Sequence, residues 1–140
     1  MKVKPAMSRY KQQCGSATVE MAIILPLLLL LVFGTAEFRI ALYRQEVLTN
    51  ASREGARAGI VLSTPAVTTA QIQSAVTNYL TSAGWNAALA TVTATGAGGA
   101  FGANVTVTVT YDTSFSVLNA LVPGIPAVKT LTGQTVMRHE

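Results

Sequence analysis

The sequence predicts an α+β protein with a long N-terminal helix, a second short helix and a small antiparallel β-sheet. Three patterns lead to this prediction: an apolar run near the N-terminus, helical spacing beyond it, and alternating Val and Thr residues towards the C-terminus. Hydrophobic residues make up 50% of the chain and charged residues only 11%, which favours a membrane-associated protein. We divide the chain into a basic leader (residues 1–15), a helix that is transmembrane and then amphipathic (residues 16–60), and a small α+β domain (residues 61–140).

The net charge of +4 comes from the leader. Four basic residues precede Gly15 with no acidic residue among them, whereas residues 16–140 carry six basic and six acidic residues. Positive charge on one flank of an apolar run keeps that flank in the cytoplasm, so we expect the outer domain to be exported across the inner membrane of a bacterium. The neutral outer part argues against a nucleic-acid partner.

Residues 16–36 form the apolar run, and Glu20 is its only charged residue. At 1.5 Å per residue, a helix of this length spans about 30 Å, which matches the hydrocarbon core of a bilayer. Backbone groups in lipid must pair within their own segment, so we expect a helix in contact with membrane lipid. Pro26 removes one donor and is expected to bend this helix slightly.

Two cleavage sites flank the run. The small residues 34–36 fit a signal peptidase cut before Glu37, which would release a secreted soluble adhesin or binding module. A cut after Gly15 would instead leave Ser16 as the new N-terminus and Glu20 as the fifth residue. This second arrangement resembles the processing site of type IV pilins, which prepilin peptidases cut on the cytoplasmic side.

Glu20 needs a partner if the run spans a membrane. A charge at the centre of a spanning helix costs about 2.5–3.5 kcal/mol, and less near the interface, so such residues usually have a function. A cut after Gly15 would provide an α-ammonium group on Ser16. The resemblance to pilins implies that this terminus neutralises the glutamate of a neighbouring subunit during assembly. The alternative is a glutamate near the cytoplasmic interface without any role.

The helix is expected to continue to Gly59 as an amphipathic segment. Its stripe of small and mostly apolar residues comprises Ala41, Arg44, Leu48, Ala51, Gly55 and Ala58. Ala51, Gly55 and Gly59 are four residues apart and would let another helix approach closely. The glycines fit a fraying helix end equally well. Glu54 and Arg57 are within one turn and can form an ion pair worth about 0.2–0.5 kcal/mol.

Several features follow one another in residues 15–60. They are Gly15, Glu20, the Leu-rich run with Pro26, Glu37 and Phe38 at its end, and the block LTNASREGAR at residues 48–57, which contains Arg53, Glu54 and Arg57. In this order they resemble the TadE-like family of pseudopilins from tight-adherence (Flp-type) pilus systems. The block at residues 48–57 is the most specific part of the resemblance.

The resemblance implies a minor pilin-like protein of the bacterial inner membrane that takes part in building adhesive pili. Its implied partners are a prepilin peptidase, other pilin or pseudopilin subunits and the inner-membrane assembly platform. A stably anchored assembly factor that never enters a filament is the alternative to a filament subunit.

In the outer domain, a second helix is expected over residues 69–83. Its apolar face comprises Ile72, Ala75, Val76, Tyr79, Leu80 and Ala83. Thr68 or Thr69 can cap its start, and Gly84 suits its end. Trp85 follows directly and is expected to pack in the core.

Alternating Val and Thr residues predict strands over residues 90–95 and 104–111, joined by a Gly-rich hairpin loop. Residues 129–138 are expected to add a third strand, with Leu131, Gly133, Thr135 and Met137 on one side. Residues 117–128 are expected to form an apolar loop that covers the sheet edge or touches lipid. The exposed Val/Thr edge is a candidate for strand addition by a partner, and a capped edge is the alternative.

The sequence offers no catalytic site, metal site or cofactor site. His139 is the only histidine, Cys14 is the only cysteine, and Asp112 is the only acidic residue between Gly55 and His139. These residues form neither a nucleophile–base set nor a metal-ligand pattern, so we expect no enzymatic activity and no small-molecule substrate. His139 lies next to the C-terminus and is expected to be solvated.

Overall fold

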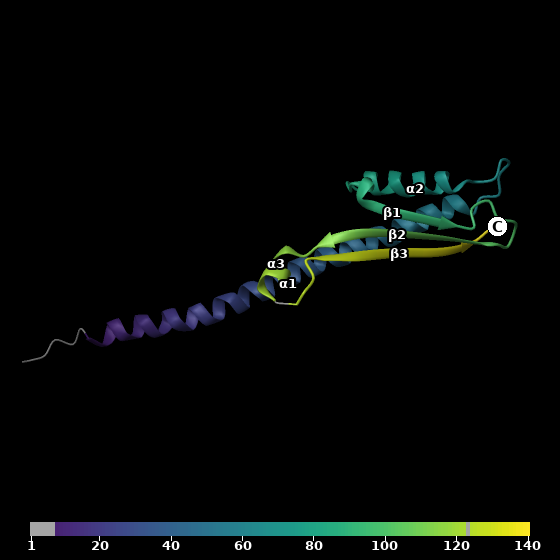
Figure 1. Cartoon of the computed structure of the whole chain (residues 1–140). Coiled ribbons are helices and arrows are strands. Elements are labelled where there is room, and N and C mark those ends of the chain that lie inside the picture. Colours follow the sequence, from purple (N-terminus) through teal and green to yellow (C-terminus); the bar gives the residue numbers. More distant parts are fainter. Residues whose placement is uncertain (1–7, 123) are drawn as a thin grey trace, which may run out of the picture.

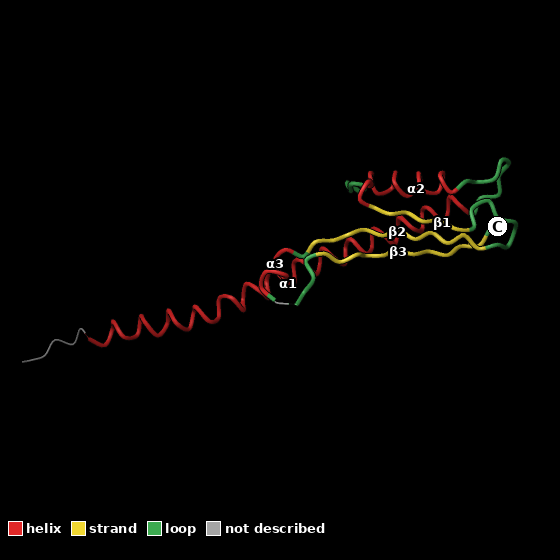
Figure 2. Tube along the Cα trace, in the orientation of Figure 1, coloured by secondary structure: helices red, strands yellow, loops and turns green. Residues whose placement is uncertain are grey.

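The computed structural model describes residues 8–122 and 124–140 and has the predicted α+β fold (Figure 1). Its elements are α1 (Ser8–Gly59), α2 (Thr69–Ser82), the short 3-10 helix η1 (Ala87–Leu89), β1 (Ala90–Thr95), β2 (Asn104–Ser114), α3 (Ser116–Leu121) and β3 (Val128–Arg138). The strands form one antiparallel sheet in the order β1-β2-β3. The N-terminal half of α1, residues 8–33, projects from this body (Figures 1 and 2). We call this half the rod.

Helix α1 is continuous through Pro26 and begins at Ser8, earlier than the expected start at residue 16. Its two halves have different surroundings. Residues 15–46 are largely exposed, whereas Val47, Leu48 and the small residues that follow are buried in the hydrophobic core. The last turns of α1 therefore share one core with α2 and the sheet.

Helix α2 confirms the second predicted helix and ends one residue before the predicted end. The hydroxyl of Thr68 accepts the N–H of Gln71, and the Gln71 side chain accepts the N–H of Thr68 in return. This reciprocal capping box satisfies two donors that the first turn leaves without helical partners. Ile72, Val76 and Leu80 recur every four residues and are buried in the core.

The sheet confirms the predicted alternation. Val105, Val107 and Val109 of β2 are buried on the face that packs against α1 and α2, and the threonines between them lie on the opposite, more open face. Strand β2 runs three residues beyond its predicted end, and β3 starts one residue before its predicted start. Trp85 packs against the core as expected, and its ring centroid lies 4.9 Å from that of Tyr111.

Helix α1 approaches strand β3 most closely at Gly133. A Cβ atom at this position would lie 2.5 Å from the carbonyl carbon and oxygen of Leu48. Nearby, the buried hydroxyl of Ser52 lies 2.7 Å from the hydroxyl of Thr135, and the Gln45 side chain donates to a carbonyl oxygen of β3. These contacts fix where the helix sits on the sheet.

The expectation of an apolar loop over residues 117–128 is wrong at its start, because Ser116–Leu121 form helix α3. Phe115 precedes this helix and its side chain provides no cap. The first N–H groups of α3 instead donate to the carboxylate of Glu37, about 80 residues earlier in the chain. A cap supplied from so far away leaves no local signal in the sequence.

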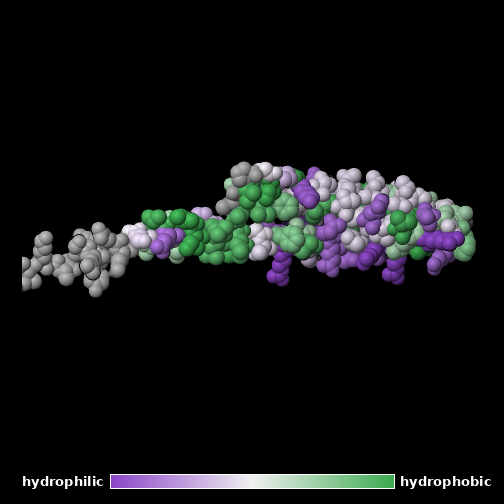
Figure 3. All heavy atoms as spheres, turned by 90° about the horizontal axis from the view of Figure 1, so that it is seen from below, coloured by the Kyte–Doolittle hydropathy of each residue, from purple (hydrophilic) through white to green (hydrophobic). Residues whose placement is uncertain are grey.

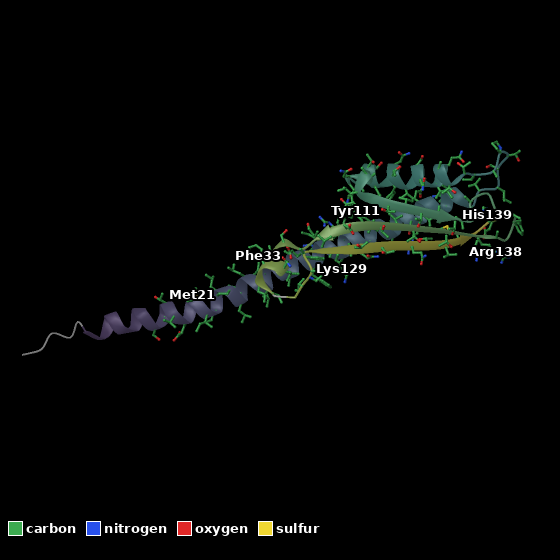
Figure 4. All side chains as sticks on the ribbon, in the orientation of Figure 1. Met21, Phe33, Tyr111, Lys129, Arg138 and His139 are labelled. Atoms are coloured by element: carbon green, nitrogen blue, oxygen red, sulfur yellow. The ribbon has the colours of Figure 1, made fainter. Side chains whose placement is uncertain are left out.

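The expectation that His139 is solvated is also wrong. Its side chain is buried, with Nδ1 lying 3.1 Å from the carbonyl oxygen of Ile60 and Nε2 lying 3.0 Å from that of Gly96. Its backbone groups bond to Gly102 and Ala103 of the hairpin loop. The C-terminus is thereby tied to the end of α1, at the end of the domain far from the rod (Figure 4).

Candidate membrane and assembly site

The predicted junction between Gly15 and Ser16 lies inside the continuous helix α1, and both residues are exposed. A Cβ atom added at Gly15 would meet no described atom within 4 Å. Glycine inside a helix costs about 1 kcal/mol relative to alanine. Packing within this chain therefore gives no reason for a glycine at this position.

Glu20 lies one turn after Ser16, whose hydroxyl donates to its Oε1 at 3.2 Å. The carboxylate is exposed, and the apolar neighbours Val19 and Met21 are about 60% exposed as well. Met21 lies on the projecting part of α1, far from the folded domain (Figure 4). Glu20 is thus accessible to a group from another molecule.

Exposed apolar side chains cover the surface of the projecting rod (Figure 3). These are Val19, Met21, Ile23, Ile24, Leu25, Leu27, Leu28, Leu29, Leu31, Val32 and Phe33. In the part of the chain that the structure describes, α1 is the one helix long and apolar enough to cross a membrane. This suggests a single-pass membrane protein.

Glu37 marks the end of the apolar run and holds α3 against α1. Its Oε1 accepts the N–H of Val117 at 2.8 Å, and its Oε2 accepts the N–H of Leu118 at 3.0 Å. These hydrogen bonds favour the charged carboxylate and hold the pKa of Glu37 below its ordinary value, against a weaker opposing effect of desolvation. Sequence reasoning identified Glu37 as part of a motif but missed this role, because the donors are remote in the chain.

The three small residues that were predicted to let a helix approach are buried in the outer domain. A Cβ atom at Gly55 would lie 2.5 Å from Cγ2 of Val76, and one at Gly59 would lie 2.8 Å from Cδ1 of Ile72. Ala51 is buried beside them. The close neighbours of Gly55 and Gly59 are therefore α2 and β2 of the same chain, and contact with a helix of another subunit stays a prediction.

The charged residues of the same block lie on another side of the helix. Arg53, Glu54 and Arg57 are exposed, and the Arg53 side chain donates to Oδ1 of Asn50 at 3.5 Å. The block thus combines a buried face of small residues with an exposed charged face. The ion pair between Glu54 and Arg57 stays a prediction.

A groove of about 430 Å³ opens between α1 and the turn that follows α2. Its walls are Ile40, Tyr43, Arg44, Gly84, Trp85, Asn86 and Tyr111. Sequence reasoning missed this groove because its walls come from three separate segments. Among residues 8–122 and 124–140, no group of His, Cys, Asp and Glu side chains could hold a metal ion.

The apolar rod and the block at residues 48–57 lie in a segment of the chain that matches a known protein family. Residues 15–57 match the family model of the TadE-like proteins. The match starts at Gly15 and ends at Arg57, so it covers the exposed apolar residues of the rod and both faces of the block at residues 48–57. It confirms the resemblance found in the sequence, and it leaves the sheet and α2 outside.

A TadE-like match implies involvement in tight-adherence (Tad/Flp) pilus systems, and this family is not known for enzymatic activity. No curated protein and no solved structure matches the chain. These two comparisons therefore provide no relative for the packing of α2 and the sheet against α1.

Proposed function

We propose that this chain is a pseudopilin, a minor pilin-like subunit of a tight-adherence pilus system, and that it acts in the assembly of adhesive pili. The observation that carries the proposal is the exposed carboxylate of Glu20 near the start of an exposed apolar rod. A charge in such a setting needs a partner once the rod enters lipid or a bundle of similar rods. The TadE-like match over residues 15–57 supports the same function.

In this proposal, a prepilin peptidase cuts after Gly15 on the cytoplasmic side of the inner membrane. The open space around Gly15 supports a role for this glycine in recognition by an enzyme rather than in packing. The basic residues of the leader keep the N-terminus in the cytoplasm, and the outer domain is exported. The mature chain begins at Ser16 with the apolar rod directly behind the new terminus.

The α-ammonium group of Ser16 then pairs with Glu20 of an adjoining subunit. Opposite charges attract more strongly at low dielectric than in water, so the pair gains strength among packed apolar rods. Ser16 and Glu20 lie on the same side of the helix, since the Ser16 hydroxyl donates to the Glu20 carboxylate at 3.2 Å. The rod anchors the chain before assembly and packs against other rods after extraction, and the outer domain faces solvent or partners.

The test is the N-terminal sequence and intact mass of the native protein, taken from membranes and from sheared surface filaments. We expect Ser16 as the first residue in both fractions. Glu37 as the first residue would instead identify a secreted soluble module. A chain confined to the membrane fraction would identify a stably anchored assembly factor, and either result contradicts the proposal.

Two variants separate enzyme recognition from folding at the leader junction. Gly15→Leu adds a side chain in open space, so the helix should persist while cleavage stops. Ala22→Leu places the same side chain at another exposed position of the rod and should leave cleavage unchanged. Cleavage of Gly15→Leu at the wild-type rate would contradict processing at this site.

A further inference from the structure

A second apolar surface lies beside the end of the rod. No Asp, Glu, Lys or Arg occurs between Asp112 and Lys129. Within this uncharged stretch, five large apolar side chains of α3 and its flanks are each partly exposed. They are Phe115, Val117, Leu118, Val122 and Ile125, and we name them the α3 foot.

The α3 foot lies level with the last turn of the apolar run. A Cβ atom at Gly34 would lie 3.3 Å from Cδ2 of Leu118. The carboxylate of Glu37 accepts the N–H groups of Val117 and Leu118. Phe33 lies beside α3 as well (Figure 4). The apolar run of residues 16–36 is about as long as the hydrocarbon core is thick, so a run that spans the bilayer would place the α3 foot at the boundary between hydrocarbon and headgroups.

Several polar groups around the α3 foot form hydrogen bonds within the chain, which lowers the cost of contact with lipid. The side chain of Asn119 donates to the carbonyl oxygen of Ile125 at 2.7 Å. The N–H of Phe115 donates to the carbonyl oxygen of Ala127 at 2.8 Å. The two oxygens of Glu37 each accept a backbone N–H, which offsets the cost of a carboxylate at this level.

Charge and surface continuity favour lipid as the partner of the α3 foot. The apolar surface of α3 adjoins the apolar rod on one side of the molecule (Figure 3). Lys129, the first charged residue after the uncharged stretch, lies at the end of β3 next to α3 (Figure 4). A lysine at this level can bury its stem in apolar surroundings and reach lipid phosphates with its ammonium group.

We infer that the α3 foot inserts into the outer leaflet of the membrane that the rod spans, as a second membrane contact beside the spanning helix. This inference rests on the membrane topology proposed above. The second contact holds the outer domain at a fixed height and rotation on the bilayer. The α3 foot must leave the lipid when the subunit enters a filament.

The test uses the full chain in vesicles of phosphatidylethanolamine and phosphatidylglycerol. Cys14→Ser removes the only cysteine, and a nitroxide is then attached to one new cysteine at a time. Ile125→Cys reports on the α3 foot, Leu28→Cys on the rod, and Asn78→Cys on the exposed face of α2. The measurement is the accessibility of each nitroxide to oxygen, which dissolves in lipid, and to a nickel complex, which stays in water.

We expect the label at residue 125 to behave like the label at residue 28, with loss of access to the nickel complex and retained access to oxygen. If residue 125 behaves like residue 78 while residue 28 is in lipid, the inference fails and the spanning helix stands. If residue 28 is also in water, the proposed topology fails. Loss of access to both reagents at residue 125 would indicate contact with a second subunit and would overturn the inference.

A second measurement avoids the nitroxide. Ile125→Trp in a Trp85→Phe background leaves one tryptophan in the chain. We expect lipids brominated on their acyl chains to quench its fluorescence, while the native Trp85 in an otherwise unchanged chain is quenched less. Equal quenching of the two tryptophans would overturn the inference.

Discussion

The two halves of helix α1 are continuous with each other but meet different surroundings. In the rod, Ile23 is 72% exposed, whereas Leu48 in the second half is fully buried under the sheet. The second half carries Gly55 and Gly59 where α2 and β2 approach, so protein covers it. The first half carries large aliphatic residues that are mostly exposed, and α3 contacts it only near its end. One helix thus has one half packed in its own domain and one half left exposed for the membrane or filament partner proposed above.

The largest effect is expected where α1 meets β3. Gly133→Ala places a Cβ atom 2.5 Å from the backbone of Leu48, which cannot rotate away, so we expect a loss of about 3 kcal/mol in the free energy of unfolding. Gly15→Ala adds the same atom in the rod and should cause no loss. Denaturant unfolding of the full chain in detergent, followed by Trp85 fluorescence, measures both. Equal stability of the two variants would show that the two halves of α1 do not differ in how closely they are packed.

Removal of the His139 ring should have the next largest effect. His139→Ala removes a buried ring whose two nitrogens lie against the carbonyl oxygens of Ile60 and Gly96, which should cost about 2 kcal/mol of unfolding free energy. His139→Gln keeps one donor group and should lose less. The same unfolding measurement applies, and a wild-type midpoint for His139→Ala would show that these contacts do not stabilise the domain.

Glu37 lies between the two halves of α1, and its substitution should affect α3 locally and in a way that depends on pH. Its folded pKa is lowered, so its contribution to holding α3 is present above the pKa of the unfolded carboxyl and is lost as pH falls through the lowered folded value. Glu37→Gln should remove this dependence and speed amide exchange at Val117 and Leu118. Glu46→Gln, at an exposed carboxylate of the same helix, is the control. Equal exchange in both variants would rule out Glu37 as the anchor of α3.

The smallest effect is expected on the exposed charged face of the second half. Glu54→Gln should lower stability by only about 0.2–0.5 kcal/mol if Glu54 pairs with Arg57, and high salt should abolish the difference. Arg53→Gln serves as a control on the same face. An effect of Glu54→Gln that does not respond to salt would exclude an ion pair.

Features with local causes were predictable from the sequence. The cap at Thr68, the alternation around Val107 and the apolar rod each depend on neighbours within a few residues, and all three are present. The TadE-like segment was recognised for the same reason, because its motif is contiguous.

Features that depend on distant partners were missed. The first turn of α3 bonds to the carboxylate of Glu37, and the buried ring of His139 lies against carbonyl groups of Ile60 and Gly96. Neither apolar composition around residue 118 nor a histidine next to a C-terminus indicates such contacts. The packing of Gly55 against α2 of the same chain was equally hidden, since a stripe of small residues does not specify which helix approaches.

The central claim is that Glu20 serves a neighbouring subunit rather than its own chain, and one comparison tests it directly. Glu20→Gln and the control Glu54→Gln are expressed separately, and the mature subunit is quantified in membranes and in sheared filaments. The account predicts that both variants lose the leader and that only Glu20→Gln is absent from filaments. Recovery of Glu20→Gln in filaments at the level of Glu54→Gln would contradict it.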